Sequence, residues 1–288
     1  MEHVILDRLR LEDIPDLVAL SDHLGWTYTA EELTVMLSAG CGYGHRNEAG
    51  RMISSAVLLP YGTELASIGA VMVDADYRRR GLGQQATQAC IEALSDRSIP
   101  IMLVATEQGK PLYERLGFRT VGTLDKLICE AGAYRSPAGL NLKGYRVEPL
   151  QIDRHLTAMV QLDRAAVGGD REQFLRLRAQ QAQTGAVLLD RLGEVAGFSL
   201  GIQNPVKMVI GPVVAPDGEL AAALVDSIAR EQVGKLRIDV PSERKELLEL
   251  LNGCGFACVN VPPVMLLHAE ELPNRDGTLY GIAAQAYG

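Results

Sequence analysis

The sequence has few cysteines, and none of them forms a paired spacing. Its five cysteines are an odd number, and no two of them enclose only two residues. Such a set argues against a disulfide framework and is typical of a reducing compartment. The histidines at positions 45, 155 and 268 lie in unrelated segments without the spacing of metal ligands, so we expect no metal site.

Long apolar runs and an excess of basic charge are also missing. No stretch of 18 apolar residues occurs, and the charged N-terminal segment lacks the apolar core of a signal peptide. The net charge is −8, with 28 Lys plus Arg against 36 Asp plus Glu. This balance disfavours a general nucleic-acid or anionic membrane surface. We therefore expect a cytoplasmic protein that has neither a nucleic-acid nor a membrane partner.

The residues that are present suffice for two domains. Of the 288 residues, 47% are hydrophobic and 22% are charged, which is a globular composition. Both halves run strand, two helices, three strands, helix, strand, helix, strand, and each ends its last helix in Gly-Phe, at Gly117 and Gly255. This repeated order indicates a duplication. We expect a first domain at residues 1–127, a linker at 128–142, where Gly, Pro and Ser gather, and a second domain at 143–288.

A hinge rich in arginine and glycine links a strand ending at Val73 to the next helix. The glycines at positions 81 and 83 let the backbone turn tightly and approach a ligand, because they lack a Cβ. Unpaired N–H groups at the helix start attract anions, and the arginines from Arg78 to Arg80 add charged donors. A diphosphate would fit here, although a solvated basic turn fits the same pattern. The hinge is not a P-loop, because no Gly-Lys-Ser/Thr follows, and it lacks the third glycine of a GxGxxG fingerprint.

Two motifs in the first half resemble those of the GNAT (GCN5-related N-acetyltransferase) superfamily. The segment from Val73 to Gly83, VDADYRRRGLG, resembles its acetyl-CoA pyrophosphate motif. The segment from Gly109 to Phe118, GKPLYERLGF, is similar to its second signature, a helix with a tyrosine four residues before Gly-Phe. The second half resembles the companion domain of the tandem-GNAT, YitH-like subfamily. The resemblance implies an α/β fold of two tandem GNAT-like domains, each a mixed, mostly antiparallel sheet flanked by helices, with the second domain degenerate.

The resemblance also implies an activity, namely transfer of the acetyl group of acetyl-CoA to the amine of a small molecule by direct attack, without a metal. Backbone amides would bind the pyrophosphate and the pantetheine arm, and Tyr113 would donate a proton to the departing thiolate; packing at the helix edge is the alternative role of Tyr113. The amine must lose a proton before it attacks, and Glu64, Glu107 or a water relay are the candidates for this step. The implied cofactor-binding residues are Met72, Val73, Arg78, Arg79, Arg80, Gly81, Leu82, Gly83 and Gln84.

The second half lacks the chemistry of the first. It has no Arg-x-x-Gly-x-Gly, and Asp217 and Glu219 stand where a diphosphate would need donors. At the same offset as the two Gly-Phe pairs, Leu251 takes the place of Tyr113. We therefore expect the second domain to wall the acceptor pocket rather than to catalyse. The expected substrate-binding residues are Trp26, Tyr28, Asp170, Arg171 and Asp239.

These assignments have alternatives. Trp26 equally fits a hydrophobic contact at the start of the helix after Thr29, and Asp170 fits a helix N-cap. For the whole chain, the alternatives to an enzyme are a sensor that binds acyl-CoA without turnover and a protein that binds the diphosphate of another cofactor. We expect a monomer or a homodimer, and we expect the apolar segment around Tyr280 to dock rather than to hang free.

Overall fold

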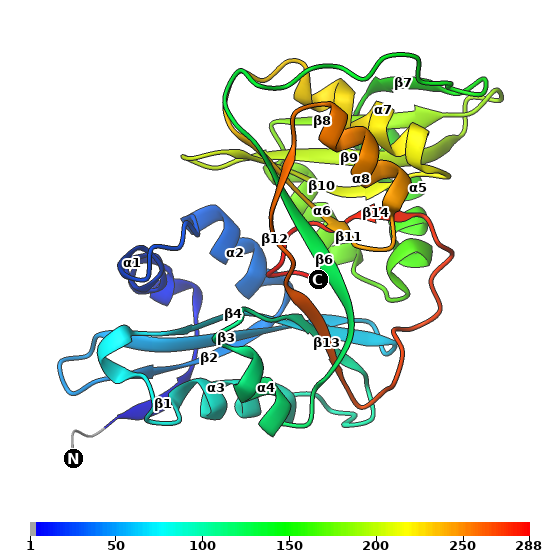
Figure 1. The fold of residues 1–288 in the computed structure, drawn as a ribbon. Coiled ribbons are helices and arrows are strands. Elements are labelled where there is room, and N and C mark those ends of the chain that lie inside the picture. The colour runs from blue at the N-terminus through cyan, green and yellow to red at the C-terminus, as the bar shows by residue number, and fades with distance from the viewer. Residues whose placement is uncertain (1–3) are drawn as a thin grey trace. The chain divides into compact units, whose positions relative to one another are not determined.

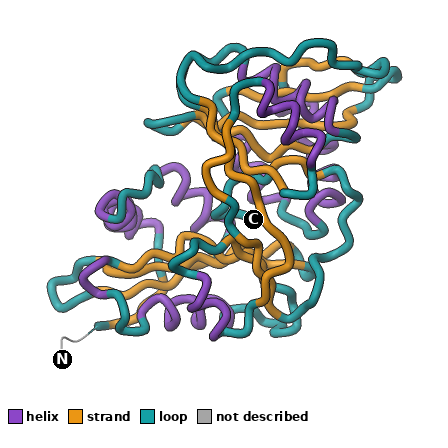
Figure 2. The backbone as a smooth tube through the Cα atoms, viewed as in Figure 1, coloured by secondary structure: helices purple, strands orange, loops and turns teal. Residues whose placement is uncertain are grey.

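The computed structural model describes residues 4–288 and divides the chain into two compact units (Figures 1 and 2). Unit 1 contains the chain up to Val121 together with Met265–Leu272 and Ala286–Gly288, and unit 2 contains Gly122–Val264 and Pro273–Gln285. Each unit is an α/β fold with a mixed, mostly antiparallel sheet and flanking helices, which confirms the predicted fold class.

Unit 1 is built on a sheet with the strand order β1-β2-β3-β4-β5-β13. The pairs from β1 to β4 are antiparallel, and β4 and β5 are parallel. Figure 1 shows α1 and α2 on one face of this sheet and α3 and α4 on the other. The elements are β1 (Ile5–Arg8), η1 (Leu11–Asp13), α1 (Ile14–His23), α2 (Ala30–Ala39), β2 (Cys41–Arg46), β3 (Met52–Tyr61), β4 (Leu65–Val73), η2 (Ala75–Tyr77), α3 (Leu82–Glu92), β5 (Ile101–Val104), α4 (Lys110–Arg115) and β13 (Pro263–Leu267), of which Met265–Leu267 belong to unit 1.

Local sequence signals explain how several of these elements begin and where they pack. The predicted capping box at the start of α2 is present, because the Glu32 backbone N–H donates to Thr29 Oγ1 at 3.2 Å and the Thr29 N–H donates to Glu32 Oε2 at 3.2 Å. Beneath α3 and α4 lies an apolar cluster that includes Cys90 and Tyr113 and also Met265 from late in the chain. The core of unit 1 therefore depends on residues from both ends of the sequence.

Unit 2 has the strand order β6-β11-β10-β9-β8-β7, with β12 paired to β6 and β14 paired to β10. Its parallel pair, β10 and β11, corresponds to β4 and β5 of unit 1, and α7 and α8 pack on one face over a large apolar cluster. The elements are β6 (Arg119–Cys129), β7 (Arg146–Pro149), α5 (Ile152–Val167), α6 (Glu172–Gln181), β8 (Thr184–Leu189), β9 (Val195–Gln203), β10 (Met208–Val214), α7 (Gly218–Ala229), β11 (Leu236–Pro241), α8 (Lys245–Gly253), β12 (Ala257–Asn260) and β14 (Leu279–Gly281).

The units differ from the contiguous division that the sequence predicts. β6 lies largely within residues 1–127, yet it pairs with β11 and β12 of unit 2. β13 lies within residues 143–288, yet it stands beside β5 of unit 1. The expected linker at 128–142 starts inside β6, which ends only at Cys129. Strand pairing joins residues far apart in the sequence, so the order of elements alone does not reveal it.

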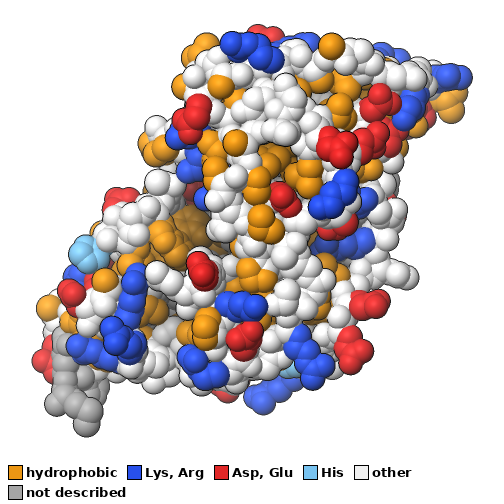
Figure 3. All heavy atoms as spheres, viewed as in Figure 1, with side chains coloured by type: hydrophobic (Ala, Val, Ile, Leu, Met, Phe, Trp, Pro, Cys, Tyr) orange, Lys and Arg blue, Asp and Glu red, His pale blue; other side chains and the backbone are white. Residues whose placement is uncertain are grey.

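The surface and the helices agree with the charge and hydropathy of the sequence. On the face drawn in Figure 3, acidic and basic side chains are interspersed over both units. None of the described helices is both long enough and apolar enough to span a membrane. The segment around Tyr280 docks as expected, since it forms β14 and is buried.

Candidate functional site

The hinge after β4 leaves the N-terminus of α3 open. Arg79 and Gly81 adopt left-handed backbone conformations, with φ of 62° and 82°, and turn the chain sharply into the helix. Among the described residues, no group accepts a hydrogen bond from the backbone N–H of Leu82, Gly83 or Gln84. These N–H groups and the helix dipole give the first turn a partial positive charge. The turn can therefore bind an anion.

The arginine side chains of the hinge add positive charge to this turn. The residues Asp74 and Tyr77, which begin the hinge, are held in place by hydrogen bonds to neighbouring residues. Asp74 is buried and holds Arg51 at 2.8 Å, and Asn47 donates to the Tyr77 hydroxyl at 3.0 Å. The Arg80 guanidinium lies 4.7 Å from the centroid of the Tyr77 ring, a cation–π distance. Arg78, Arg79 and Arg80 are exposed here, and so is the single acidic side chain of Asp76.

The strand that leads into the hinge has an edge without a strand partner. β4 and β5 pair at only two positions, Ala66 with Ile101 and Ser67 with Met102, although β4 continues to Val73. Ala70 has a φ of 47° and lies beside a register shift against β3, so β4 carries a bulge here. The β4 edge beyond Ser67 therefore faces away from β3 without a ladder to β5, a position where an extended ligand can add its own hydrogen bonds.

Helix α4 brings Tyr113 to the end of β4. A Cβ on Gly83 would lie 3.1 Å from methyl carbons of both Val73 and Leu112, so the first turn of α3 meets β4 and α4 closely. Tyr113 follows Leu112, is 7% exposed, and stacks edge-on against Phe118 with 5.9 Å between ring centroids. Burial raises the pKa of the Tyr113 hydroxyl. The hinge and this phenol thus lie on one side of unit 1.

The two carboxylates predicted as general bases lie in different turns of unit 1, Glu64 before β4 and Glu107 before α4. Glu64 is exposed in the turn before β4, where its carboxylate accepts from the Thr63 N–H at 3.0 Å. A strand of nine residues spans roughly 30 Å at 3.3 Å per residue, so Glu64 lies far from the end of β4 that approaches Tyr113. Glu107 is exposed in the turn between β5 and α4. Glu107 thus lies in the turn that leads into α4, the helix of Tyr113, whereas Glu64 lies before the opposite end of β4.

Trp26 and Tyr28 form an aromatic pair in the loop between α1 and α2. Their ring centroids are 5.9 Å apart in an edge-to-face arrangement, and both side chains are partly buried. Ser21 fixes the loop, since its carbonyl accepts from the Trp26 N–H at 2.8 Å and its hydroxyl from the Tyr28 N–H at 3.1 Å. The pair can present a preformed apolar surface to a ligand.

The substrate-binding residues predicted in the second half already have partners within unit 2. Arg171 is buried and makes a two-pronged ion pair with Asp163 at 2.7 and 2.9 Å, so its guanidinium is not available to a substrate carboxylate. Asp170 accepts a hydrogen bond from the Glu172 N–H at 3.1 Å, although the N-cap position of α6 is taken by Arg171 and not by Asp170 as expected. Asp239 is buried on β11 beside Arg237.

Unit 2 closes the helix end that corresponds to the open turn of α3. Asp217 is the N-cap of α7 and accepts from the Leu220 N–H at 2.9 Å. Its carboxylate also holds Lys143 at 2.8 Å, and Glu219 lies 3.4 Å from the same ammonium. The protein's own carboxylates therefore occupy the position where a diphosphate would bind, as the sequence indicates.

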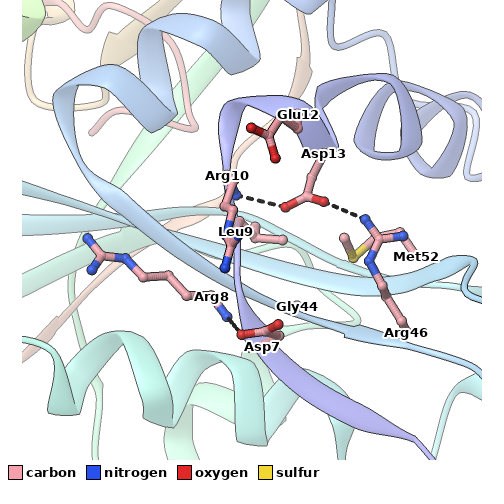
Figure 4. Close-up of a pocket in the computed structure, with 9 residues that line it drawn as sticks. All are labelled: Asp7, Arg8, Leu9, Arg10, Glu12, Asp13, Gly44, Arg46 and Met52. Carbon is pink, nitrogen blue, oxygen red and sulfur yellow. Dashed lines mark hydrogen bonds and ion pairs between the residues drawn. The ribbon is translucent and has the colours of Figure 1, made fainter.

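A polar depression of about 190 Å³ lies elsewhere on unit 1 (Figure 4). Its main cation, Arg46, is neutralised by Asp13 at 2.5 Å and Asp16 at 2.6 Å. No residue of the hinge or of α4 lines it, so it is separate from the candidate site. In the part of the chain that the structure describes, no group of three or more His, Cys, Asp or Glu could hold a metal ion.

Sequence reasoning missed the residues that support the hinge from behind. His45 of β2 lies 2.7 Å from Ser54 Oγ through Nδ1 and 3.0 Å from Gln85 Oε1 through Nε2, which ties the first turns of α3 to the sheet. The Ser55 hydroxyl donates to the Ala70 carbonyl at 2.7 Å and so holds the bulge. Nothing in the sequence around Ala70 signals a left-handed residue, whereas a histidine alternating into a buried strand face could have indicated a polar contact.

The chain resembles acetyltransferases in sequence and in structure. Residues 10–118 match a family model described as "Acetyltransferase (GNAT) family", and residues 159–281 match one described as "Acetyltransferase (GNAT) domain". The chain is 34% identical over 286 residues to the uncharacterized N-acetyltransferase YitH of Bacillus subtilis (strain 168), with 98% of each chain covered. This relative spans both units.

Two solved structures share the fold across nearly the whole chain. A candidate acetyltransferase from Pyrococcus horikoshii has a TM-score of 0.79 at 22% identity, covering 99% of this chain and 96% of its own. A tandem GNAT protein from the clavulanic acid biosynthesis pathway has a TM-score of 0.68 at 15% identity, covering 92% and 98%. At these identities the likeness concerns the fold alone.

Proposed function

Because the chain belongs to the GNAT acetyltransferase family, we propose that unit 1 transfers the acetyl group of acetyl-CoA to the amine of a small molecule. The observation that carries this proposal is the open first turn of α3, which follows three exposed arginines. A helix N-terminus and guanidinium groups together favour a diphosphate. The corresponding turn of α7 is closed by Asp217, so we assign acetyl-CoA binding to unit 1 alone.

The residues around the hinge fit coenzyme A along its length. In this proposal, the backbone N–H groups of the hinge and of the first turn of α3 bind the pyrophosphate. The unpaired edge of β4 binds the pantetheine amides as an added strand would. Gly83 leaves the room that a close backbone approach requires, because a Cβ there would already press on Val73 and Leu112. The proposed donor-binding residues are Met72, Val73, Arg78, Arg79, Arg80, Gly81, Leu82, Gly83 and Gln84.

The transfer itself needs an electrophile, a neutral amine and a stable leaving group. A backbone N–H at the end of β4 polarises the thioester carbonyl, and one such donor lowers the barrier by about 3 kcal/mol in other enzymes. The neutral amine attacks the carbonyl carbon, so that a C–N bond forms as the C–S bond breaks. Tyr113 donates its hydroxyl proton to the departing sulfur, and its raised pKa keeps it protonated at neutral pH.

The amine must also lose a proton, and the acceptor must be held near the thioester. We assign this proton to Glu107 rather than Glu64, directly or through water, because Glu107 lies in the turn that leads into the helix of Tyr113 and Glu64 lies at the far end of β4. We assign to Trp26 and Tyr28 an apolar wall for the acceptor, since Ser21 already fixes their loop.

The role of Tyr113 is tested by removing only its hydroxyl. We expect Tyr113→Phe to lower turnover by about 10²-fold to 10³-fold, because a positioned general acid contributes about that much. The dissociation constant for acetyl-CoA should change little, since the ring and its contact with Phe118 remain. Release of coenzyme A thiol with a panel of small amines measures turnover, and calorimetry measures binding.

Tyr134→Phe is the matched control for this experiment. Tyr134 lies in unit 2, donates to Asp226 at 2.9 Å, and also has a pKa raised by burial. Removal of the Tyr134 hydroxyl should leave turnover unchanged. If Tyr113→Phe turns over as fast as the unaltered protein, Tyr113 is a packing residue. If the unaltered protein binds acetyl-CoA but releases thiol with no amine, the chain is a sensor, and the proposed activity is wrong.

A further inference from the structure

Strands β6 and β11 of unit 2, which lie side by side in Figure 1, carry charged residues on one face of the sheet. Along β11, Leu236, Ile238 and Val240 belong to the apolar cluster under α7 and α8. Arg237 and Asp239 alternate with them and therefore point to the opposite face. Cα pairing places Lys126 of β6 directly opposite Asp239, and hence on that same face.

The single carboxylate of this group is hydrogen-bonded through only one of its two oxygens. Asp239 is 1% exposed, and its Oδ1 accepts from Arg237 Nη2 at 3.1 Å and from Gln285 Nε2 at 2.8 Å. Its other oxygen, Oδ2, lies 2.8 Å from Arg237 Nη2 without a hydrogen-bond geometry. Gln285 and Arg237 thus hold Asp239 in place from two sides.

The cations of the group keep donors without acceptors. Arg237 Nε is buried, and no described residue accepts its proton. Among the described residues none accepts a hydrogen bond from Lys126 Nζ, and no carboxylate lies within ion-pair distance of it. Two donors on neighbouring strands therefore face the same side of the sheet with nothing bound to them, although their side chains are long enough to meet diagonally.

The local charge balance is positive. Lys126 and Arg237 are two cations beside one carboxylate, that of Asp239. Burial lowers the pKa of Lys126, Arg237 and Lys207 lower it further, and Asp239 opposes them. Partly buried positive charge without a counter-charge is unfavourable. A bound anion would supply the missing charge and the missing acceptors together.

We propose that Lys126 and Arg237 form a binding site for the anionic group, a carboxylate or a phosphate, of a small molecule. Arg237 Nε and Lys126 Nζ donate to the anion, and Asp239 and Gln285 orient the guanidinium for it. The site belongs to unit 2, whose own helix turn is closed by Asp217. The anion belongs either to the acceptor amine of the proposed reaction or to a separate ligand.

Calorimetric titration of the full chain with inorganic phosphate and with succinate tests the site. We expect at least one probe to bind, and to bind more weakly as the salt concentration rises, because charged donors hold the anion. Repeating the titration at two salt concentrations measures this dependence. Lys126→Met should weaken binding about tenfold or more.

The matched control is Lys235→Met, since Lys235 directly precedes β11 and pairs with Glu130 at 3.0 Å instead of facing this group. It should leave the affinity unchanged. The proposal is wrong if neither probe binds the unaltered protein, or if Lys126→Met binds as the unaltered protein does. If the probe competes with the acceptor amine in the thiol-release assay, the site holds the acid group of the acceptor. Binding without competition assigns the site to a separate ligand, and this result stands even if no amine is acetylated.

Discussion

At the residue scale, Gly81 is the position where the backbone conformation of the hinge bears most directly on the proposed binding of acetyl-CoA. Its φ of 82° is in the left-handed region, and a Cβ there would meet only Gln85 Nε2, at 3.7 Å. Space is thus not limiting, and the penalty of a side chain is conformational. Gly81→Val should cost about 1–2 kcal/mol of stability and turn the first N–H groups of α3 away from the pyrophosphate. We expect the dissociation constant for acetyl-CoA, measured by calorimetry, to rise by about tenfold or more.

Gly193→Val separates loss of stability from loss of binding. Gly193 has a φ of 86° and lies in the turn between β8 and β9 of unit 2. A Cβ at this position would have Arg146 Nη2 as its nearest atom, at 3.6 Å. The substitution therefore carries a similar backbone penalty away from the hinge. We expect it to lower the unfolding free energy about as much as Gly81→Val and to leave acetyl-CoA affinity unchanged. If Gly81→Val and Gly193→Val lowered the affinity for acetyl-CoA equally, the assignment of the pyrophosphate to the hinge would be wrong.

Among single residues, the sequence predicted the open hinge but not its support. Arginine and glycine before a helix are local signals, and the structure shows an open helix turn there. The contact of His45 with Gln85 and the left-handed Ala70 depend on how β2, β3 and α3 pack, so no local pattern announces them. For Arg171, the sequence predicted a substrate-binding residue where the structure has a buried ion pair with Asp163. A charged residue at the end of an element is expected to be exposed, and the sequence does not show that a buried partner lies beside it.

At the scale of elements, α3 depends on a neutral histidine for its attachment to the sheet. Burial lowers the pKa of His45, while the hydrogen bond to Gln85 raises it less. The unfolded chain therefore takes up a proton before the folded one does as pH falls. The stabilisation by His45 is complete above its unfolded pKa of 6.5 and is lost as pH falls below that value toward the lowered folded pKa.

We expect the unfolding free energy from urea titration to be lower at about pH 5.5 than at about pH 8. His45→Gln should reduce this difference, because glutamine does not titrate and can still hydrogen-bond to Ser54 and Gln85. Burial lowers the pKa of His155 as well, so part of the difference should persist in the variant. An identical difference in the variant and in the unaltered protein would show that His45 does not couple α3 to pH.

The equivalent helices α3 and α7 of the two units differ in how they begin. α3 and α7 both follow a strand that pairs in parallel with the next strand, β5 or β11. α3 begins at an exposed glycine and stays open, whereas α7 begins at Asp217, which satisfies its own first turn. The helix with the open end can bind a diphosphate, and the capped helix is limited to packing over the core of unit 2.

At the scale of the whole molecule, the sequence predicted the elements better than their partners. The duplication and the order of strands and helices follow from periodicity and turn residues, and the structure reproduces them. The exchange of strands, with β6 in unit 2 and β13 in unit 1, depends on which edges meet in space. A chain cut at residue 127 would therefore lack Met265–Leu272 and Ala286–Gly288 of unit 1 and would leave β6 without β11 and β12.

Met265 offers a direct test of this exchange. Its side chain is fully buried in the cluster beneath α3 and α4, although it lies late in the sequence. Met265→Ala should lower the unfolding free energy of unit 1 by about 2–5 kcal/mol through the cavity it leaves. Trp26 is the single tryptophan and lies in unit 1, so its fluorescence during urea unfolding follows that unit.

Val259→Ala on β12 is the control for the Met265 experiment, since Val259 lies in unit 2 and is 57% exposed. It should shift the Trp26 transition by no more than about 0.5 kcal/mol. If residues 1–127 formed a complete domain, Met265→Ala would leave the Trp26 transition where the control leaves it. A large shift with Met265→Ala alone would mean that the hinge proposed to bind acetyl-CoA rests on a core completed by the far half of the chain. Ligand affinity and folding of unit 1 would then be inseparable from the second half, even though that half has no hinge of its own.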